Sequence, residues 1–97
     1  MATLRVEHAI HDYGIWQQAF DSFAEARAKA GVRSFAIRQP VDDPQYLMLD
    51  LEFDTPGQAE AFARFLHEHV WSSRASSPAL AGAPHARVLD LMRTGER

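Results

Sequence analysis

The chain has 97 residues, 46% of them hydrophobic and 24% charged, and its formal net charge is −3, which is typical of one folded domain and not of a disordered chain. It contains no cysteine, which excludes disulfides, thiolate nucleophiles, iron–sulfur clusters and cysteine-bound zinc. It also has no basic run, so nucleic acid is not an expected partner.

The N-terminal segment "MATLRVEHAI" carries charges where a signal peptide would need its apolar stretch, and no apolar run reaches membrane-spanning length. We therefore expect a cytoplasmic protein without a membrane partner. A chain of this length buries a modest share of its surface, so a second subunit covering an exposed sheet would stabilise it. This favours a homodimer.

The first third of the chain predicts a strand followed by a helix. Residues 3–10 alternate in polarity, and the face that turns toward the core carries Leu4, Val6, His8 and Ile10. A helix is expected over residues 13–30, with Asp12 as its N-cap and Gly31 at its C-terminal end. Its buried stripe is predicted to be Trp16, Phe20 and Phe23.

The middle of the chain predicts a β-hairpin. The stretches "VRSFAIRQ" and "YLMLDLEF" both alternate, and "PVDDPQ" between them supplies turn residues. The core face of the second strand is expected to carry Leu47, Leu49, Leu51 and Phe53.

A second helix is predicted to begin in "DTPGQ", where Thr55 is the N-cap, Pro56 the first helical residue and Gln58 the partner that completes a capping box. It should end near Trp71. The residues expected to face inward are Ala59, Phe62, Ala63, Leu66, His69 and Val70.

The last part of the chain contains the Ser-, Ala- and Pro-rich stretch "SSRASSPALAGAPHA". Because a structureless loop of this length is uncommon in a compact domain, we expect a single helical turn over residues 78–81, capped by Ser77. The segment "RVLDLM" then predicts a final strand.

The predicted order βαββαβ is that of an α+β, ferredoxin-like domain, in which two helices cover one face of a four-stranded antiparallel sheet. We expect this single domain to span residues 1–93, with a short tail over 94–97. The other sheet face carries a mixed set of side chains that includes Arg5, Glu7, Arg38, Asp50 and Glu52. These charges predict a cross-strand ladder at a dimer interface, or alternatively a polar barrel interior that binds a small ligand.

Three stretches of the chain resemble the dimeric α/β-barrel superfamily, and in particular the antibiotic-biosynthesis-monooxygenase-like proteins. They are "HDYGIWQQAFDS", "GVRSFAIRQPVDDPQYLMLDLEFDTPGQAEAF" and "SPALAGAPHARVLDL". The resemblance implies that two ferredoxin-like subunits face their sheets together to form a homodimer. Because that superfamily holds polyketide-modifying, haem-degrading and non-catalytic members, the fold does not choose the activity.

The resemblance to the haem-degrading members implies that His69 could be an axial ligand of a haem iron. Against it, Glu7 and His8 stand where those enzymes carry an asparagine, and no tryptophan precedes His69 in its helix. We therefore expect no haem and no other cofactor.

His8 is the leading candidate for a catalytic residue, because its place in the first strand puts an imidazole among apolar neighbours. A buried titratable group needs a partner, and Tyr13, Arg27 and His69 are within plausible reach. His8 is then either a hydrogen-bonded core histidine or a base in a pocket. Candidate ligand-binding residues around it are Tyr13, Trp16, Phe20, Phe62 and His69.

The same aromatic residues fit a packed core, which is the commoner role of such a stripe. His67 and His69 cannot chelate one ion together, because residues two apart on a helix point to opposite sides. A site that joins His8 and His69 with an acidic residue stays open, but no metal is expected.

Two functions remain open on this sequence. One is a non-catalytic homodimer that binds a small aromatic or polyketide-like molecule, or another protein. The other is a cofactor-independent monooxygenase or cyclase with His8 as its base and a pocket between helices and sheet.

Overall fold

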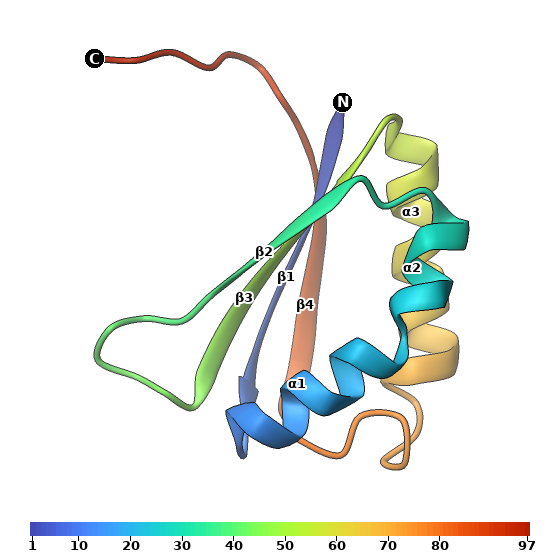
Figure 1. The fold of residues 1–97 in the computed structure, drawn as a ribbon, viewed down its shortest axis with the longest axis vertical. Coiled ribbons are helices and arrows are strands. Elements are labelled where there is room, and N and C mark those ends of the chain that lie inside the picture. Colours follow the sequence, from blue (N-terminus) through green and yellow to red (C-terminus); the bar gives the residue numbers. More distant parts are fainter.

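The computed structural model describes residues 1–97 and contains a four-stranded antiparallel sheet in the order β2-β3-β1-β4, with helices on one side of it (Figure 1). In chain order the elements are β1 (Ala2–Ile10), α1 (Tyr13–Ser22), α2 (Ala24–Ala30), β2 (Ser34–Arg38), β3 (Tyr46–Phe53), α3 (Pro56–Phe65), the π-helical turn η1 (Leu66–Val70) and β4 (Leu80–Asp90). The predicted ferredoxin-like fold is confirmed, except that the first helix is divided in two.

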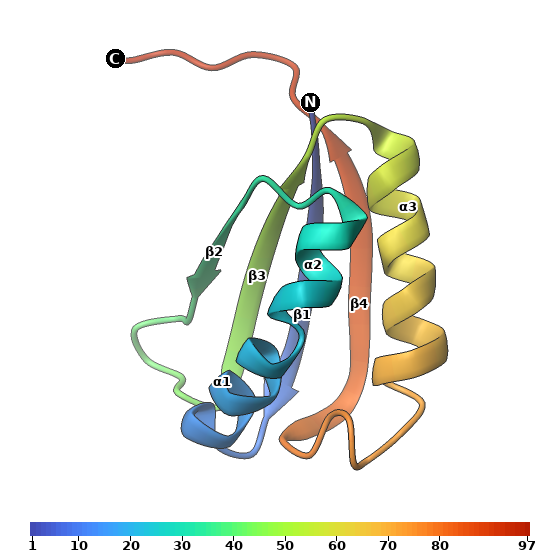
Figure 2. The ribbon, with the colours of Figure 1, turned by 45° about the vertical axis from the view of Figure 1, so that its right-hand side comes forward.

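The core lies between the helices and the sheet, and all the helices cover the same sheet face (Figure 2). Alternate residues of β1 and β3 point into it, because successive side chains of a strand face opposite sides. In the β1–β3 pairing, Leu4 lies opposite Leu51 and Val6 opposite Leu49. The predicted core faces of both strands are confirmed, His8 included, since each of these residues is buried.

The predicted single helix over residues 13–30 is wrong at one point, because Phe23 interrupts it. Phe23 has φ −100° and ψ 16°, and its N–H bonds the carbonyl oxygen of Phe20. Just before the break, the Ser22 hydroxyl donates to the carbonyl oxygen of Ala19 at 2.6 Å, a local bond of the kind that bends helices. The two ends agree with the sequence: Asp12 accepts from the N–H of Ile15 at 2.9 Å, and Gly31 closes α2 at φ 92°.

The helix predicted to begin in "DTPGQ" is α3, and it starts as predicted, with the capping box of Thr55 and Gln58 and with Pro56 in its first turn. Its last turn differs, because Leu66–Val70 is π-helical and the N–H of Trp71 bonds the carbonyl oxygen of Leu66 at 2.7 Å. A π turn takes up more residues than an α turn. Val70 therefore takes the inward position, and the predicted inward position of His69 is wrong.

The approach to β4 also departs from expectation. The predicted helical turn over 78–81 is wrong: the N–H of Leu80 bonds the carbonyl oxygen of Ser77 at 3.2 Å in a simple turn, and Leu80 already begins the strand. The start of β4 pairs with Ala9 and Ile10 at the end of β1. A register shift follows in β4, and Gly82, at φ 73°, accommodates it. The strand ends at Asp90, and residues 91–97 extend away from the sheet (Figure 1).

Candidate functional site

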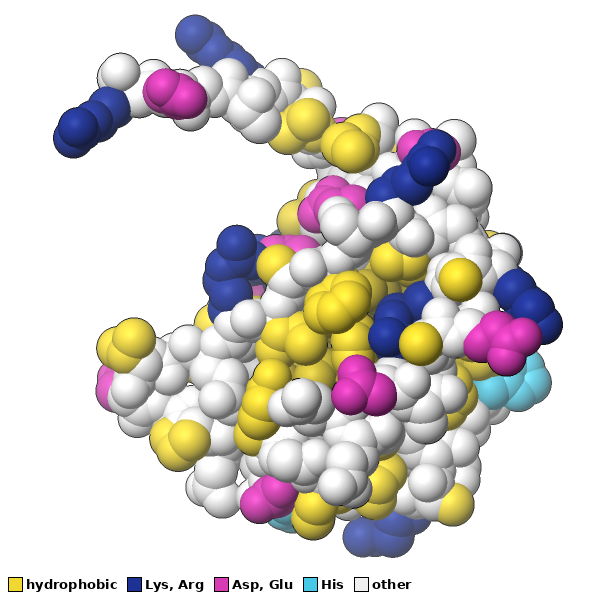
Figure 3. Space-filling model, in the orientation of Figure 1, with side chains coloured by type: hydrophobic (Ala, Val, Ile, Leu, Met, Phe, Trp, Pro, Cys, Tyr) yellow, Lys and Arg dark blue, Asp and Glu magenta, His cyan; other side chains and the backbone are white.

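A cavity of about 70 Å³ lies between the helices and the sheet, and most of the residues that line it are hydrophobic. Its walls come from β1, β3, α1, α2, α3, η1 and residues 71–80. Figure 3 shows hydrophobic side chains gathered in a hollow between the sheet and the α1 and α2 helices, with a basic side chain at its margin. The space is therefore an apolar pocket with few polar groups, which is typical of sites for small organic molecules.

His8 on β1 lines this cavity and is 4% exposed. Its Nδ1 lies 3.0 Å from the carbonyl oxygen of Ala9. Since a carbonyl oxygen only accepts hydrogen bonds, Nδ1 carries the hydrogen and Nε2 keeps a lone pair, without a hydrogen-bond partner in the chain. Burial lowers the pKa of His8, and the bond to Ala9 opposes this only in part. His8 is thus a neutral imidazole at neutral pH, able to accept a hydrogen bond or a proton.

An aromatic row runs from His8 along α1. The ring centres of His8 and Trp16 are 6.4 Å apart, and Trp16 stacks on Phe20 at 5.0 Å with an interplanar angle of 17°. Trp16 and Phe20 are one helical turn apart, so both side chains point to the same side of α1 and line the cavity. Phe62 of α3, which is 4% exposed, closes the cavity from the other helix.

Arg27 on α2, expected from the sequence only as a candidate partner for His8, is a polar residue of the cavity wall. It is 8% exposed, and its Nη1 donates a hydrogen bond to the carbonyl oxygen of Phe20. Its guanidinium carbon lies 3.6 Å from the ring centre of Phe20 and 5.5 Å from that of Phe35. Burial lowers the pKa of Arg27, while Asp21 raises it by its charge. The sequence signal was its place in the apolar stripe, seven residues after Phe20.

The structure brings four of the six predicted site residues together at the cavity: His8, Trp16, Phe20 and Phe62. Tyr13 is 36% exposed, lies outside the lining, and stacks on Trp16 at 6.1 Å. His69 is exposed and contacts Phe65, with ring centres 5.5 Å apart, so it does not meet His8. The pairing of His8 with His69 is therefore not formed, and no group of three or more His, Asp or Glu side chains is arranged to hold a metal ion.

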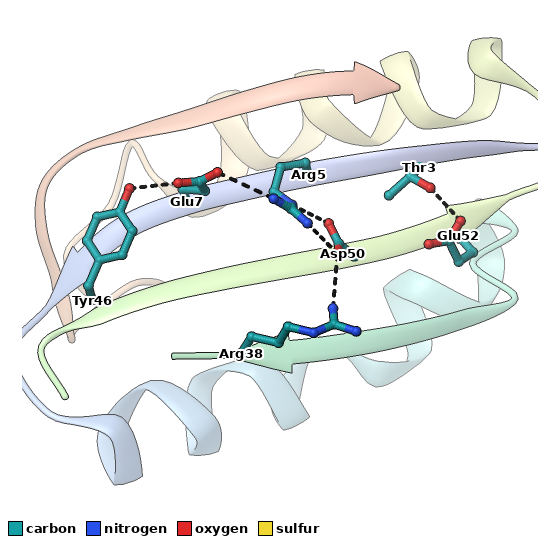
Figure 4. Close-up of polar contacts among 7 residues, drawn as sticks. All are labelled: Thr3, Arg5, Glu7, Arg38, Tyr46, Asp50 and Glu52. Carbon is teal, nitrogen blue, oxygen red and sulfur yellow. Dashed lines mark hydrogen bonds and ion pairs between the residues drawn. The ribbon is translucent and has the colours of Figure 1, made fainter. Parts of the chain in front are cut away.

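The sheet face opposite the helices carries the predicted cross-strand charge pairs (Figure 4). Arg5 binds Asp50 through two hydrogen bonds of 2.5 and 2.9 Å, and Arg38 contacts the same carboxylate at 3.2 Å. The Tyr46 hydroxyl donates to Glu7 at 2.9 Å. The side chain of Asp50 is only 13% exposed, so this network is a partly desolvated layer and not a set of isolated surface pairs.

No family model and no curated protein matches the chain. Among solved structures, a protein from Nitrosomonas europaea provisionally named an antibiotic biosynthesis monooxygenase is 20% identical, with a TM-score of 0.68 over 96% of this chain and 100% of its own. A Bordetella bronchiseptica protein with the same provisional name is 13% identical, with a TM-score of 0.71 over 95% and 97%. One from an uncultured marine organism, described as a dimeric ferredoxin-like protein, is 10% identical, with a TM-score of 0.66 over 97% and 96%.

The chain shares the ferredoxin-like fold of these proteins. The resemblance seen in the sequence is confirmed at this level, and at such identities it extends to the fold and not to the activity. None of the helices combines the length and the apolarity that a membrane span requires.

Proposed function

We propose that the protein is a homodimer joined through its open sheet faces, and that each subunit binds a small aromatic molecule in the cavity between helices and sheet. The cavity carries this proposal. It combines aromatic walls, provided by Trp16, Phe20 and Phe62, with few polar side chains. One of these is His8, whose Nε2 is an unused hydrogen-bond acceptor. An apolar space with few but well-placed polar groups binds an aromatic ligand by burial and orients it by a hydrogen bond.

The size of the cavity favours a single ring over a fused polyketide. Its volume of about 70 Å³ is smaller than the ~150 Å³ cavity that holds one benzene molecule in another protein. A ring therefore requires some widening, and residues 71–78 are the part of the wall that can move with least loss. This segment contains no helix or strand, and its bonds include one from Ser77 Oγ to the carbonyl oxygen of Ser73 at 2.8 Å.

Phenol is the simplest probe of this site, because its ring fits the aromatic walls and its hydroxyl can donate to Nε2 of His8. Anisole has a similar shape without the hydrogen-bond donor. We expect phenol to bind more tightly than anisole to the wild-type protein, by roughly fivefold to tenfold for one neutral hydrogen bond. Isothermal titration calorimetry measures both affinities, and both tryptophans of the chain, Trp16 and Trp71, line the cavity as fluorescent reporters.

The variant His8→Leu removes the acceptor and keeps an apolar side chain of similar reach. It should bind phenol and anisole equally, whereas the control His11→Leu, at an exposed histidine outside the cavity, should keep the preference. Failure of the wild-type protein to bind either compound would contradict the proposed ligand site. Binding that His8→Leu leaves unchanged would place the ligand elsewhere.

A cofactor-independent monooxygenase or cyclase is the alternative function, with His8 as the base. We do not favour it, because Arg27 is the only other ionisable side chain that lines the cavity and no proton donor accompanies the imidazole. Turnover of a phenolic substrate that scales with protein concentration and disappears in His8→Leu would reverse this preference.

Dimerisation is supported by the character of the open sheet face and by similar folds described as dimeric. On that face, residues between the charge pairs are half-buried and include Ala36 and Met48. Asp50 is already paired with Arg5 and Arg38 within the chain, so a second copy can cover this part of the face without leaving these three charges unpaired. Arg87, which lies opposite Arg5 on the same face, forms no ion pair within the chain.

The variant Met48→Lys adds a charge to the centre of the open face without removing any of its ion pairs. We expect it to shift the protein from dimer to monomer in sedimentation velocity, while Gln18→Lys, an exposed change on the helical side, leaves the assembly unchanged. A wild-type protein that sediments as a monomer, or a Met48→Lys dimer, would contradict the interface. The cytoplasmic location expected from the N-terminal segment stays a prediction.

A further inference from the structure

Arg27 is a buried cation to which no carboxylate of the chain is paired. Its side chain is 8% exposed, and it forms no salt bridge. No aspartate or glutamate lines the cavity, although the chain as a whole carries a net charge of −3. Arginine is seldom buried without an ion-pair partner, because a guanidinium loses much hydration free energy there. The cavity therefore has a positive wall without its counter-charge.

The structural role of Arg27 uses only part of its guanidinium. One nitrogen, Nη1, bonds the carbonyl oxygen of Phe20 near the end of α1, and the flat face of the group lies over the Phe20 ring. No fully enclosed side-chain nitrogen of the protein lacks a partner, so the remaining N–H groups of Arg27 reach open space. That space is the cavity on one side and, on the other, a shallow depression bordered by Ala28, Val32 and Phe35.

The contacts also set the order of the polar groups along the cavity. His8 contacts Trp16, Trp16 stacks on Phe20, and Phe20 lies under the guanidinium of Arg27. The acceptor Nε2 and the cationic donor are thus at the two ends of a row of two aromatic rings. A ligand that satisfies both groups carries an anion at one end and a hydrogen-bond donor at the other.

We propose that the ligand is a single-ring aromatic carboxylate, bound with its carboxylate on Arg27, its ring along Trp16 and Phe20, and a hydroxyl directed to His8. This rests on the proposed aromatic site and specifies its charge. A carboxylate accepts paired hydrogen bonds from a guanidinium and supplies the counter-charge that the cavity lacks. Arg27 borders both the cavity and the outer depression, which is also lined by the exposed Arg33.

The test compares benzoate with benzamide, its neutral analogue of nearly the same shape, by isothermal titration calorimetry on the wild-type protein. We expect benzoate to bind about tenfold to a hundredfold more tightly, as for a charge-assisted hydrogen bond. 4-Hydroxybenzoate should bind more tightly still, and His8→Leu should remove that gain alone. The comparison on the wild-type protein needs no variant to fold.

Three variants assign the effect to its residue. Arg27→Met should abolish the preference for benzoate over benzamide, and Arg27→Lys should keep part of it. The control Arg64→Met, at an exposed arginine of α3 that borders neither the cavity nor the outer depression, should leave the preference unchanged. Circular dichroism checks the fold of each variant. A shift of the Arg27 Nε–H resonance on addition of benzoate to the wild-type protein provides a second readout.

The carboxylate proposal would be overturned if benzoate and benzamide bound with equal affinity, or if Arg27→Met kept the preference for benzoate. Binding of phenol in the same experiments would still support the aromatic site. If phenol, benzoate and benzamide all fail to bind, the aromatic site itself is overturned and the carboxylate proposal with it.

Discussion

The guanidinium carbon of Arg27 lies 3.6 Å from the ring centre of Phe20, and Nη1 of Arg27 donates a hydrogen bond to the carbonyl oxygen of the same residue. Phe20 thus holds a buried cation through its ring and its backbone at once. Its ring also stacks on Trp16 and meets Phe35 edge to face, each at 5.0 Å. One residue therefore joins the helix junction, the core and the cavity wall.

Truncation of Phe20 should be costly. We expect Phe20→Ala to lower the free energy of unfolding by about 3 to 5 kcal/mol, because it leaves a hole beneath Trp16 and Arg27. Urea unfolding measures the loss. The control Phe35→Ala removes the same ring from a site that is 51% exposed and should cost much less. Equal losses in the two variants would show that burial does not decide the difference.

The stability of the protein should fall in mild acid because of His8. Burial lowers the pKa of His8 in the folded protein below the ordinary value of about 6.5. In the range between the two values the unfolded chain binds more protons than the folded one, so its contribution to stability is complete above about pH 6.5 and is lost as the pH falls through the folded pKa.

Thermal unfolding midpoints at about pH 7.5 and pH 5, on either side of the ordinary histidine pKa, measure this loss. His8→Leu should show a smaller decrease between the two conditions than the wild-type protein, and the exposed variant His11→Leu should behave as wild type. The same decrease in His8→Leu and wild type would assign the acid sensitivity to other groups.

Gly31 should not tolerate a side chain. It ends α2 at φ 92°, and an added Cβ would lie 2.8 Å from Nε2 of Gln58, whose side chain also completes the capping box with Thr55. We expect Gly31→Ala to lower the free energy of unfolding by about 1 to 2 kcal/mol through backbone strain and a disturbed cap. At Gly57 an added Cβ meets only Thr55 Oγ1 at 3.9 Å, so Gly57→Ala should be neutral or stabilising in urea unfolding.

Asp50 should matter more to stability than the exposed Asp54. Asp50 binds both Arg5 and Arg38 and its side chain is 13% exposed, whereas Asp54 pairs with Arg33 in the open. We expect Asp50→Asn to lower the free energy of unfolding by about 1 to 3 kcal/mol, because it leaves two guanidinium groups without their shared carboxylate. Asp54→Asn should change urea unfolding little. Similar small effects of both changes would show that the network is solvated.

Local signals in the sequence predicted the ends of the elements well. Asp12, Thr55 and Gly31 lie at the caps where they were expected, because capping depends on a few neighbouring backbone groups and on φ. Strand alternation likewise identified the buried faces of β1 and β3, with His8 among them, since the side-chain period of a strand is set by the backbone. These features needed no knowledge of the rest of the chain.

The sequence was a poorer guide to where the helices are interrupted and to which of their side chains face the core. The break at Phe23 and the π turn over Leu66–Val70 each shift the helix face, because the backbone leaves the regular α-helical period at both places. The shift turned His69 to the surface and separated it from His8. A periodic pattern cannot show such a change, because it assumes one helical period throughout.

The sequence by itself determined the ferredoxin-like order of elements, the buried imidazole of His8 and the aromatic stripe of Trp16 and Phe20. Only the tertiary structure decided what these residues surround: a cavity whose one cation, Arg27, comes from the second half of the broken helix and is buried without a carboxylate. Spacing along one chain segment fixes which side chains share a face. Which faces meet, and whether they leave space between them, is set by the packing of segments distant in sequence.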